Sequence, residues 1–462
     1  MGVSYETVRF SLAALVTWSA AGISRAQDFE LPAIPSAEGP GYFIDSAQPS
    51  PSDEPLPMPQ IPTKDYYGVS EPVCQPWRLF PQREGCWNVY GWVDGGVTAN
   101  GQFNDSRYNG VTTFNDRHEG MLNQFYLVTE RSIDTGGCGF DWGGRLDLLY
   151  GSDYIFTQAT GLETNPDGTN AWNGSPFYGL AMPQAYAEVG YNNLSAKLGH
   201  FFTPIGYESV MAPSNFFYSH AYTMQYGEPF THTGALATYN INDNTSLIGG
   251  VVNGWDGFDR VSDPLAYIGG MTWTNGDALS VAFTAISGEE PTLALSPSAG
   301  AFTPRHMYSL VVNYQINDCW NYVIQHDLGH QDDAAALPPN LPGIGANPHA
   351  EWYGINQYIF RKFNDCWTAG FRFEWFRDDD GVRVTGIRPD AGHPLFAVPG
   401  QFAGNFYEMT AGVNWKPNQN IIVRPEVRYD WYDGLNLTGI EPFSDGNRDD
   451  QFLAGVDVIV LW

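Results

Sequence analysis

The last thirteen residues, Asp450 to Trp462, place the strongest constraint on how this chain folds. Side chains of a β-strand alternate between its two faces. If these residues form a strand, one face carries Gln451, Gly455 and Asp457, while the other carries only apolar side chains. The apolar face consists of Phe452, Ala454, Val456, Val458, Val460 and Trp462. The segment therefore predicts a strand with one wholly apolar face that ends on an aromatic residue.

A C-terminal strand of this kind is typical of the closing strand of a bacterial outer-membrane β-barrel. From Cys86 onward the chain consists of aromatic-rich alternating segments of about ten residues, the length of a tilted membrane-crossing strand. Every second connection between these segments is a short turn rich in Asn, Asp and Gly. These residues tolerate the left-handed backbone geometry of tight hairpins. We expect seven such turns on the periplasmic side, at Gly136-Gly137, Asn192-Asn193, Asn242-Asp243-Asn244, Asn275-Gly276-Asp277, Asn317-Asp318, Asn364-Asp365 and Asn418-Gln419-Asn420.

Eight longer connections alternate with these turns, and together they require sixteen antiparallel strands. The start of the first strand and the end of the last strand then lie on the short-turn side. We therefore predict an all-β fold, a transmembrane antiparallel up-and-down β-barrel of about 16 strands with short periplasmic turns and long extracellular loops. A barrel of this size is wide enough for an aqueous channel. The loops are expected near residues 101–118, 152–180, 204–231, 254–263, 288–305, 331–349, 379–403 and 434–448.

The N-terminal part of the chain has a different composition. Arg9 precedes an apolar run over residues 10–21, and small residues flank a cleavage point after Ala26, so residues 1–26 are expected to be a secretory signal peptide. Residues 27–85 are rich in proline and predict an extended or disordered periplasmic tail, either a plain linker or a tether to peptidoglycan. Residues 86–462 are the expected barrel. No later apolar run reaches the roughly 18 residues of a membrane helix.

The charge balance excludes one class of partner. With 22 basic and 51 acidic residues the formal net charge is −29, which argues against nucleic-acid binding and favours cations in a pore. Five cysteines form no CxxC or CxxCH motif, and no HExxH is present, so we expect no catalytic residue, cofactor or metal. All five, Cys74, Cys86, Cys138, Cys319 and Cys366, are expected on the periplasmic side, either as thiols or with a disulfide between Cys74 and Cys86.

Charged residues identify the face of each strand that points into the barrel. Arg or Lys facing lipid near the midplane costs about 2–4 kcal/mol, so charges that alternate with apolar residues are assigned to the lumen. Pro425 is awkward within one such strand because it donates no hydrogen bond. These charged residues either bind a solute in the lumen or only pair with one another across neighbouring strands. The predicted pore-lining residues, eight acidic and five basic, are Asp94, Arg145, Asp147, Glu188, Lys197, Arg372, Glu374, Glu408, Arg424, Glu426, Arg428, Asp430 and Asp457.

The third long loop, residues 204–231, is too rich in Phe and Tyr to lie comfortably in water. We expect it to fold into the barrel and narrow it, although packing on the outer rim is an alternative. Folding inward would bring Glu208, His220, Glu228 and His232 near a constriction, where rings of charge set ion preference. The acidic clusters at residues 332–333 and 378–380 suit Ca²⁺ or Mg²⁺, or are solvated loop charge.

Ordered short motifs support a family resemblance over essentially residues 87–462. They are Gly91 to Asn100 (GWVDGGVTAN), Asn123 to Leu127 (NQFYL), Leu198 to Glu208 (LGHFFTPIGYE) and Asn215 to Ser219 (NFFYS). With these motifs the chain resembles the OmpL-like β-barrel porin family. The resemblance implies an outer-membrane channel for small solutes and a homo-oligomer, such as the trimers common among porins, but no particular substrate or site residues.

Three functions are compatible with the sequence. The first is a porin for passive diffusion of ions and small hydrophilic solutes, mildly cation-selective, surrounded by outer-membrane lipid. The second is a phospholipase-like barrel enzyme, which needs a Ser and a His on one external face with an orienting polar partner; His200 and His326 fall on the expected lipid-facing rows. The third is a surface binding or structural barrel that does not conduct.

Overall fold

The computed structural model describes residues 77–81, 83, 85–101, 109–112, 119–166, 169–174, 177–259, 265–292, 302–334, 349–384, 402–434 and 439–462. The expected signal peptide and most of the expected proline-rich tail lie outside these residues. None of the helices in the described ranges is long and apolar enough to cross a membrane.

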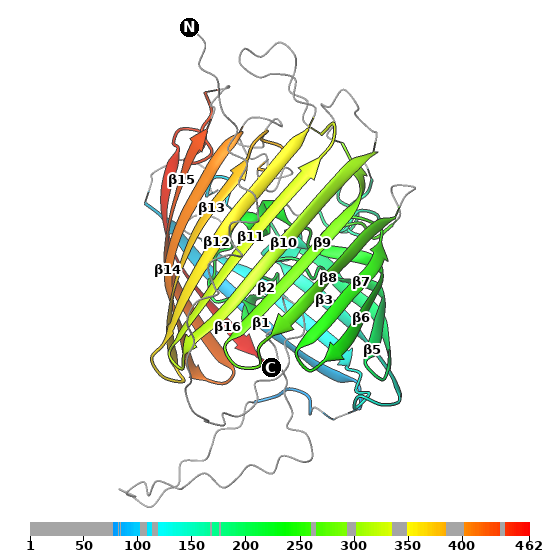
Figure 1. The fold of residues 1–462 in the computed structure, drawn as a ribbon. Helices are drawn as coiled ribbons and strands as arrows, with labels where there is room; N and C mark the ends of the chain where they lie inside the picture. The colour runs from blue at the N-terminus through cyan, green and yellow to red at the C-terminus, as the bar shows by residue number, and fades with distance from the viewer. Residues whose placement is uncertain are drawn as a thin grey trace, which may run out of the picture. The chain divides into compact units, whose positions relative to one another are not determined.

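The described chain forms one closed antiparallel barrel, which confirms the predicted fold class (Figure 1). Each strand pairs with its neighbours in sequence, and β1 pairs with β16 to close the wall. The strands are β1 (Asn88–Asn100), β2 (Gly120–Arg131), β3 (Phe140–Gly151), β4 (Gly179–Tyr191), β5 (Leu194–Phe202), β6 (Thr231–Asn242), β7 (Thr245–Val252), β8 (Ala266–Thr274), β9 (Leu279–Pro291), β10 (Phe302–Asn317), β11 (Trp320–Gln331), β12 (Ala350–Lys362), β13 (Trp367–Asp378), β14 (Gly404–Asn418), β15 (Ile421–Gly434) and β16 (Asp450–Leu461).

The two-residue alternation read from the C-terminal segment holds in the barrel wall. In β16, Val458 is 41% exposed on the outer face, whereas Asp457 is fully buried on the inner face. At the end of this strand, the backbone of Trp462 exchanges two hydrogen bonds with Gly91, of 3.0 and 3.2 Å. The aromatic terminus therefore joins the last strand to the first.

The repeated Asn-Asp-Cys-Trp turns have a common local cause. Asn317 Oδ1 accepts the backbone N–H of Cys319 at 3.0 Å and of Trp320 at 3.1 Å. Asn364 repeats this arrangement in the β12–β13 turn, with distances of 2.9 and 3.0 Å. A short Asn side chain that binds the backbone two residues later fixes a tight turn. The likeness of the two segments therefore reflects shared turn chemistry.

Pro425 is accommodated where the pairing of β14 with β15 is interrupted. Paired residues are present at Gly412 with Glu426 and at Trp415 with Val423, with no pair between them, whereas pairing of β15 with β16 continues through Pro425. The proline, which has no N–H to donate, therefore lies where β14 and β15 are not paired. The strand keeps the predicted register.

Four of the five cysteines, Cys86, Cys138, Cys319 and Cys366, are described, and all four are exposed thiols. The three that follow β1 lie in or beside the short turns. Cys74 lies outside the described residues, so its pairing with Cys86 stays a prediction.

Candidate pore constriction

The connection from β5 to β6, residues 203–230, crosses the interior of the barrel. It contains two short helical turns, η3 (Ala212–Ser214) and η4 (Thr223–Gly227), and most of its residues are buried. We call it the inner loop. Its contacts with inward-facing side chains of β2 and of β11 to β15 rule out packing on the outer rim.

Arg424 of β15 anchors the first part of the inner loop. Its Nη1 donates to three backbone carbonyl oxygens, those of Ala212 at 2.9 Å, Asn215 at 2.9 Å and Phe217 at 3.0 Å. On its other side the guanidinium pairs with Asp457 of β16. A planar group with five donors is suited to collecting several acceptors at once. Arg424 thus joins the wall to the loop backbone.

Arg372 of β13 holds the middle of the loop. It donates to the Ser219 carbonyl at 2.8 Å and to Glu208 Oε1 at 2.7 Å, and it also pairs with Glu408 of β14. Arg428 of β15 binds the next residue of the loop in the same way. It donates to the His220 carbonyl at 2.5 Å and to Asp430 at 2.8 Å. Together the three arginines therefore bind five carbonyl groups of one loop, between Ala212 and His220.

Two carboxylates bind the N–H groups of the same loop. Glu426 accepts from the backbone N–H of Tyr218 at 2.7 Å. Glu374 accepts from the N–H of Tyr222 at 2.5 Å and from the N–H of Thr223 at 2.6 Å. Buried charges need partners, and here the peptide groups of the loop supply them. The charged rows of β13 and β15 thus fix the position of the loop.

Uncharged side chains of the wall also bind carbonyl groups of the loop. Gln124 of β2 donates to the Val210 carbonyl at 2.7 Å, and Trp352 of β12 donates to the Gly227 carbonyl at 2.9 Å. The inner loop is therefore attached to widely separated parts of the barrel wall. It narrows the interior by spanning it.

An apolar cluster lies next to the loop. Ile205 and Tyr226 of the loop pack with Trp255, Phe402 and Phe443, which come from three other long connections. Two small cavities border the loop, one of about 10 Å³ lined by Asp94 and Tyr218 among others, and one of about 30 Å³ lined by Glu208 and Glu228 among others. Both cavities are lined by residues of the inner loop together with residues of the barrel wall.

The carboxyl groups of the inner loop differ in their electrostatics. Burial alone would raise the pKa of Glu208, but the Arg372 guanidinium and the His220 contact at 3.3 Å lower it to about 2. Burial, and then the nearby Asp327 of β11, raise the pKa of Glu228 well above its ordinary value. One loop carboxylate is therefore stabilised as an anion, whereas the other favours a proton.

A family model described as "Putative beta-barrel porin-2, OmpL-like" matches residues 87–462. The chain belongs to this family of outer-membrane porins. No curated protein sequence matched the chain.

Solved structures share the fold at low sequence identity. OmpT of Vibrio cholerae, an outer membrane protein, is 12% identical, with a TM-score of 0.50 over 81% of this chain and 97% of that chain. The anion-selective porin from Comamonas acidovorans is 10% identical, with a TM-score of 0.53 over 82% and 99%. Salmonella typhi OmpF, solved with daunomycin, is 12% identical, with a TM-score of 0.50 over 81% and 97%. These likenesses show the barrel fold.

Eleven of the thirteen residues predicted to line the pore are buried on the inner face of this OmpL-like barrel. Glu188 and Lys197 are half-buried and lie opposite each other on β4 and β5. That any of them lines a conducting pore stays a prediction. The eleven are Asp94, Arg145, Asp147, Arg372, Glu374, Glu408, Arg424, Glu426, Arg428, Asp430 and Asp457.

The four residues predicted for the constriction occupy three places. Glu208 contacts both His220 and Arg372. Glu228 lies farther along the loop, where Gln325 of β11 donates to it. His232 belongs to β6, at the base of the loop, where its ring contacts the Gly254 carbonyl at 2.8 Å and Thr203 Oγ1 at 2.9 Å. A role for these residues in ion preference stays a prediction.

Further inward charges were not selected from the sequence. Asp327 of β11, Glu130 of β2 and the pair Glu290 and Arg305 of β9 and β10 all face the interior. The strand alternation would have found Asp327, because placing His326 outward places its neighbour inward. Glu130 and Arg305 lie near strand ends, where the alternation is harder to assign.

The outer wall holds a Ser and His pair different from the histidines considered from the sequence. His200 lies on the outward row of β5 as expected, but it is fully buried, beside Phe258. His326 faces outward and contacts the Tyr308 hydroxyl at 3.3 Å. Ser287 Oγ of β9 lies 2.8 Å from His306 Nδ1 of β10 on the exposed face.

Proposed function

We propose that this protein is a porin for passive diffusion of ions and small hydrophilic solutes, in which the inner loop forms the constriction. The observation that carries the proposal is the row of inward charges on β13 and β15 that binds the backbone of the loop. A loop that crosses a sixteen-stranded barrel narrows the lumen without blocking it. Export through a signal peptide at residues 1–26 is part of the proposal.

We further propose a mild preference for cations. The inward residues chosen from the sequence include eight carboxyl groups and five basic groups, and Glu130 and Asp327 add to the acidic side. An excess of carboxylates along the path attracts cations and repels anions. The fold itself does not decide this point, because a structure of the same fold is described as an anion-selective porin.

Conductance across a planar bilayer tests both parts. Purified, folded protein is expected to give stepwise ion currents, and the reversal potential in a KCl gradient is expected to have the sign of cation preference. A reversal potential of anion sign would contradict the charge argument. Folded protein that carries no current would favour the third alternative, a surface barrel that binds without conducting.

The enzyme alternative is favoured by a single observation, the contact of Ser287 with His306 on the outer wall beside a groove of about 510 Å³. Among the described residues, no carboxylate or amide contacts the second ring nitrogen of His306, so a group that would orient the base is lacking there. Phospholipid hydrolysis by the wild type that disappears in Ser287→Ala would establish the enzyme. Equal release of fatty acid from both proteins would remove it.

A homotrimer is also proposed. Its support is that one solved structure of similar fold, OmpT of Vibrio cholerae, with a TM-score of 0.50, is described as a trimer form. Light scattering of the detergent complex should give three chains per particle. A mass of one chain would exclude the trimer under those conditions.

A further inference from the structure

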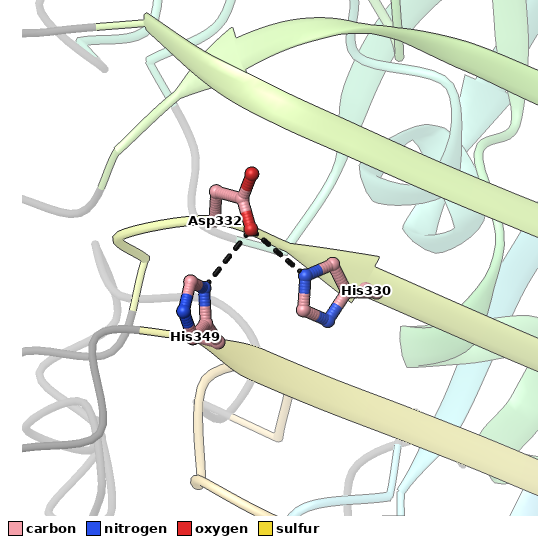
Figure 2. A group of neighbouring side chains, drawn as sticks. All are labelled: His330, Asp332 and His349. Atoms are coloured by element: carbon pink, nitrogen blue, oxygen red, sulfur yellow. Dashed lines mark hydrogen bonds and ion pairs between the residues drawn. The ribbon is translucent and has the colours of Figure 1, made fainter.

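Two histidines and one aspartate meet at the rim of the barrel that carries the long loops (Figure 2). His330 lies near the end of β11, Asp332 follows that strand, and His349 immediately precedes β12. Asp332 Oδ1 is 2.9 Å from His330 Nε2 and 2.9 Å from His349 Nδ1. The two imidazole rings are stacked, with centroids 5.5 Å apart. One carboxylate oxygen is thus shared between two imidazole rings.

We propose that His330, Asp332 and His349 form a binding site for a divalent transition-metal ion of the Zn²⁺ class. One ligand atom from each residue lies within 4.8 Å of the other two. Bonds of about 2.0–2.2 Å to Zn²⁺ place neighbouring tetrahedral ligands about 3.3 Å apart. Small side-chain rotations therefore bring the three atoms into coordinating positions around one ion.

The donor set selects the class of metal. Imidazole suits Zn²⁺, Cu²⁺ and Ni²⁺, whereas Ca²⁺ and Mg²⁺ prefer sites made of oxygen atoms. With three protein ligands, a fourth position stays available for water. The acidic loop clusters considered from the sequence do not behave alike, because Asp332 lies between histidines while Asp378 accepts three backbone N–H groups.

A second carboxylate is placed to orient one of the ligands. Glu351 of β12 is the Cα partner of His330, and its Oε1 lies 3.5 Å from His330 Nδ1. Metal-bound histidines usually give their other ring N–H to a carboxylate, which fixes the tautomer and the ring orientation. Glu351 is therefore a positioning residue, while His330 Nε2 contacts the metal.

The surroundings also favour a cation. Asp332 Oδ1 already receives two ring nitrogens, and further carboxylates stand close by. Asp380 accepts the Glu351 N–H at 3.1 Å, and burial together with Asp379, Asp378 and Glu351 raises the pKa of Asp380 to about 6. Such crowding of carboxylates at one rim attracts positive ions.

The strand pairing prepares the site before metal arrives. Pairing of Gln331 with Ala350 fixes the ends of β11 and β12 side by side. Ligands from both ends of the connection are therefore held close together by the sheet. A bound ion would tie the base of this connection together. No short metal motif marks the site, because seventeen positions separate Asp332 from His349.

Calorimetry with ZnCl₂ on the full chain, prepared without a histidine tag, tests the site. We expect one Zn²⁺ per chain, with affinity at least tenfold weaker in His330→Ala and in His349→Ala. The matched control is His326→Ala, since His326 lies on the same strand and the same outer face but contacts Tyr308 instead. This control should bind as the wild type does. Glu351→Gln should weaken binding about 10-fold, as loss of an orienting partner does.

A second measurement separates a lost site from a damaged fold. Zn²⁺ should raise the unfolding temperature of the wild type and of His326→Ala, but not that of His330→Ala, while all three unfold alike in chelator. The proposal is overturned if the wild type binds no Zn²⁺, or if His330→Ala and His349→Ala bind it unchanged. It is equally overturned if Mg²⁺ at the same concentration displaces Zn²⁺. The ion would then be held by surface carboxylates and not by the imidazole rings.

Discussion

At the scale of the residue, the inner-face arginines link the barrel wall to a loop backbone. Arg372, Arg424 and Arg428 each divide their donors between carboxylates of the wall and carbonyl oxygens of residues 203–230. Buried guanidinium groups are tolerated only when most donors are used. The same contacts that satisfy the charges therefore position the inner loop.

Arg372→Ala tests this arrangement. The substitution leaves Glu408 and Glu208 buried without their strongest partner, a change that costs about 3–5 kcal/mol when a buried pair is broken. The free energy of unfolding, measured by denaturant titration in detergent, should fall by that amount. Arg377→Ala is the control, because Arg377 lies on the same strand but is 31% exposed and pairs with Asp379; a partly exposed pair contributes about 1 kcal/mol or less. Equal losses in both variants would contradict the role of Arg372.

At the scale of the element, two carboxyl groups act where the inner loop ends and β6 begins. Asp256 accepts the N–H of Phe230 at 2.8 Å and of Thr231 at 2.9 Å, which holds the point where the loop enters β6. Just before it, Glu228 faces Asp327 of β11. Because the pKa of Glu228 is raised, docking of this part of the loop favours the protonated carboxyl group.

This raised pKa predicts how docking depends on pH. Stability linked to Glu228 is complete below its ordinary value of 4.5 and is lost as pH rises toward the raised value in the docked loop. Ion current should therefore increase with pH, because an ionised Glu228 is repelled by Asp327. Glu228→Gln keeps the shape of the side chain and removes the titration, so its current should vary less with pH. A pH profile identical to that of the wild type would contradict this assignment.

At the scale of the whole molecule, the outer wall must be compatible with hydrocarbon. Val427 of β15 faces outward at mid-strand and is 44% exposed, while its neighbours Glu426 and Arg428 face inward. Val427→Arg should lower the free energy of unfolding in lipid by about 2–4 kcal/mol, and Ile421→Arg, on the same face at the strand end, by about 0–1 kcal/mol. Equal effects at both depths would argue against a membrane-embedded wall.

Much of the barrel was predictable because its rules are local. Alternation placed Asp457 inside and Val458 outside, and short Asn-rich turns located the hairpins, so the strand number followed. The anchoring of the loop was not predictable, because the contact of Arg424 with Ala212 joins residues 212 positions apart. The cluster of His330 and His349 was missed for the same reason, since strand register rather than spacing brings its members together.

Single-channel recording with sugars of graded size tests whether the inner loop narrows a conducting barrel. We predict small, cation-preferring currents for the wild type. Only small sugars should enter the channel and reduce these currents. Arg372→Ala should give larger currents that admit larger sugars, and Arg377→Ala should match the wild type. Wild-type currents already as large as those of Arg372→Ala, or the absence of current in all three folded proteins, would contradict this prediction.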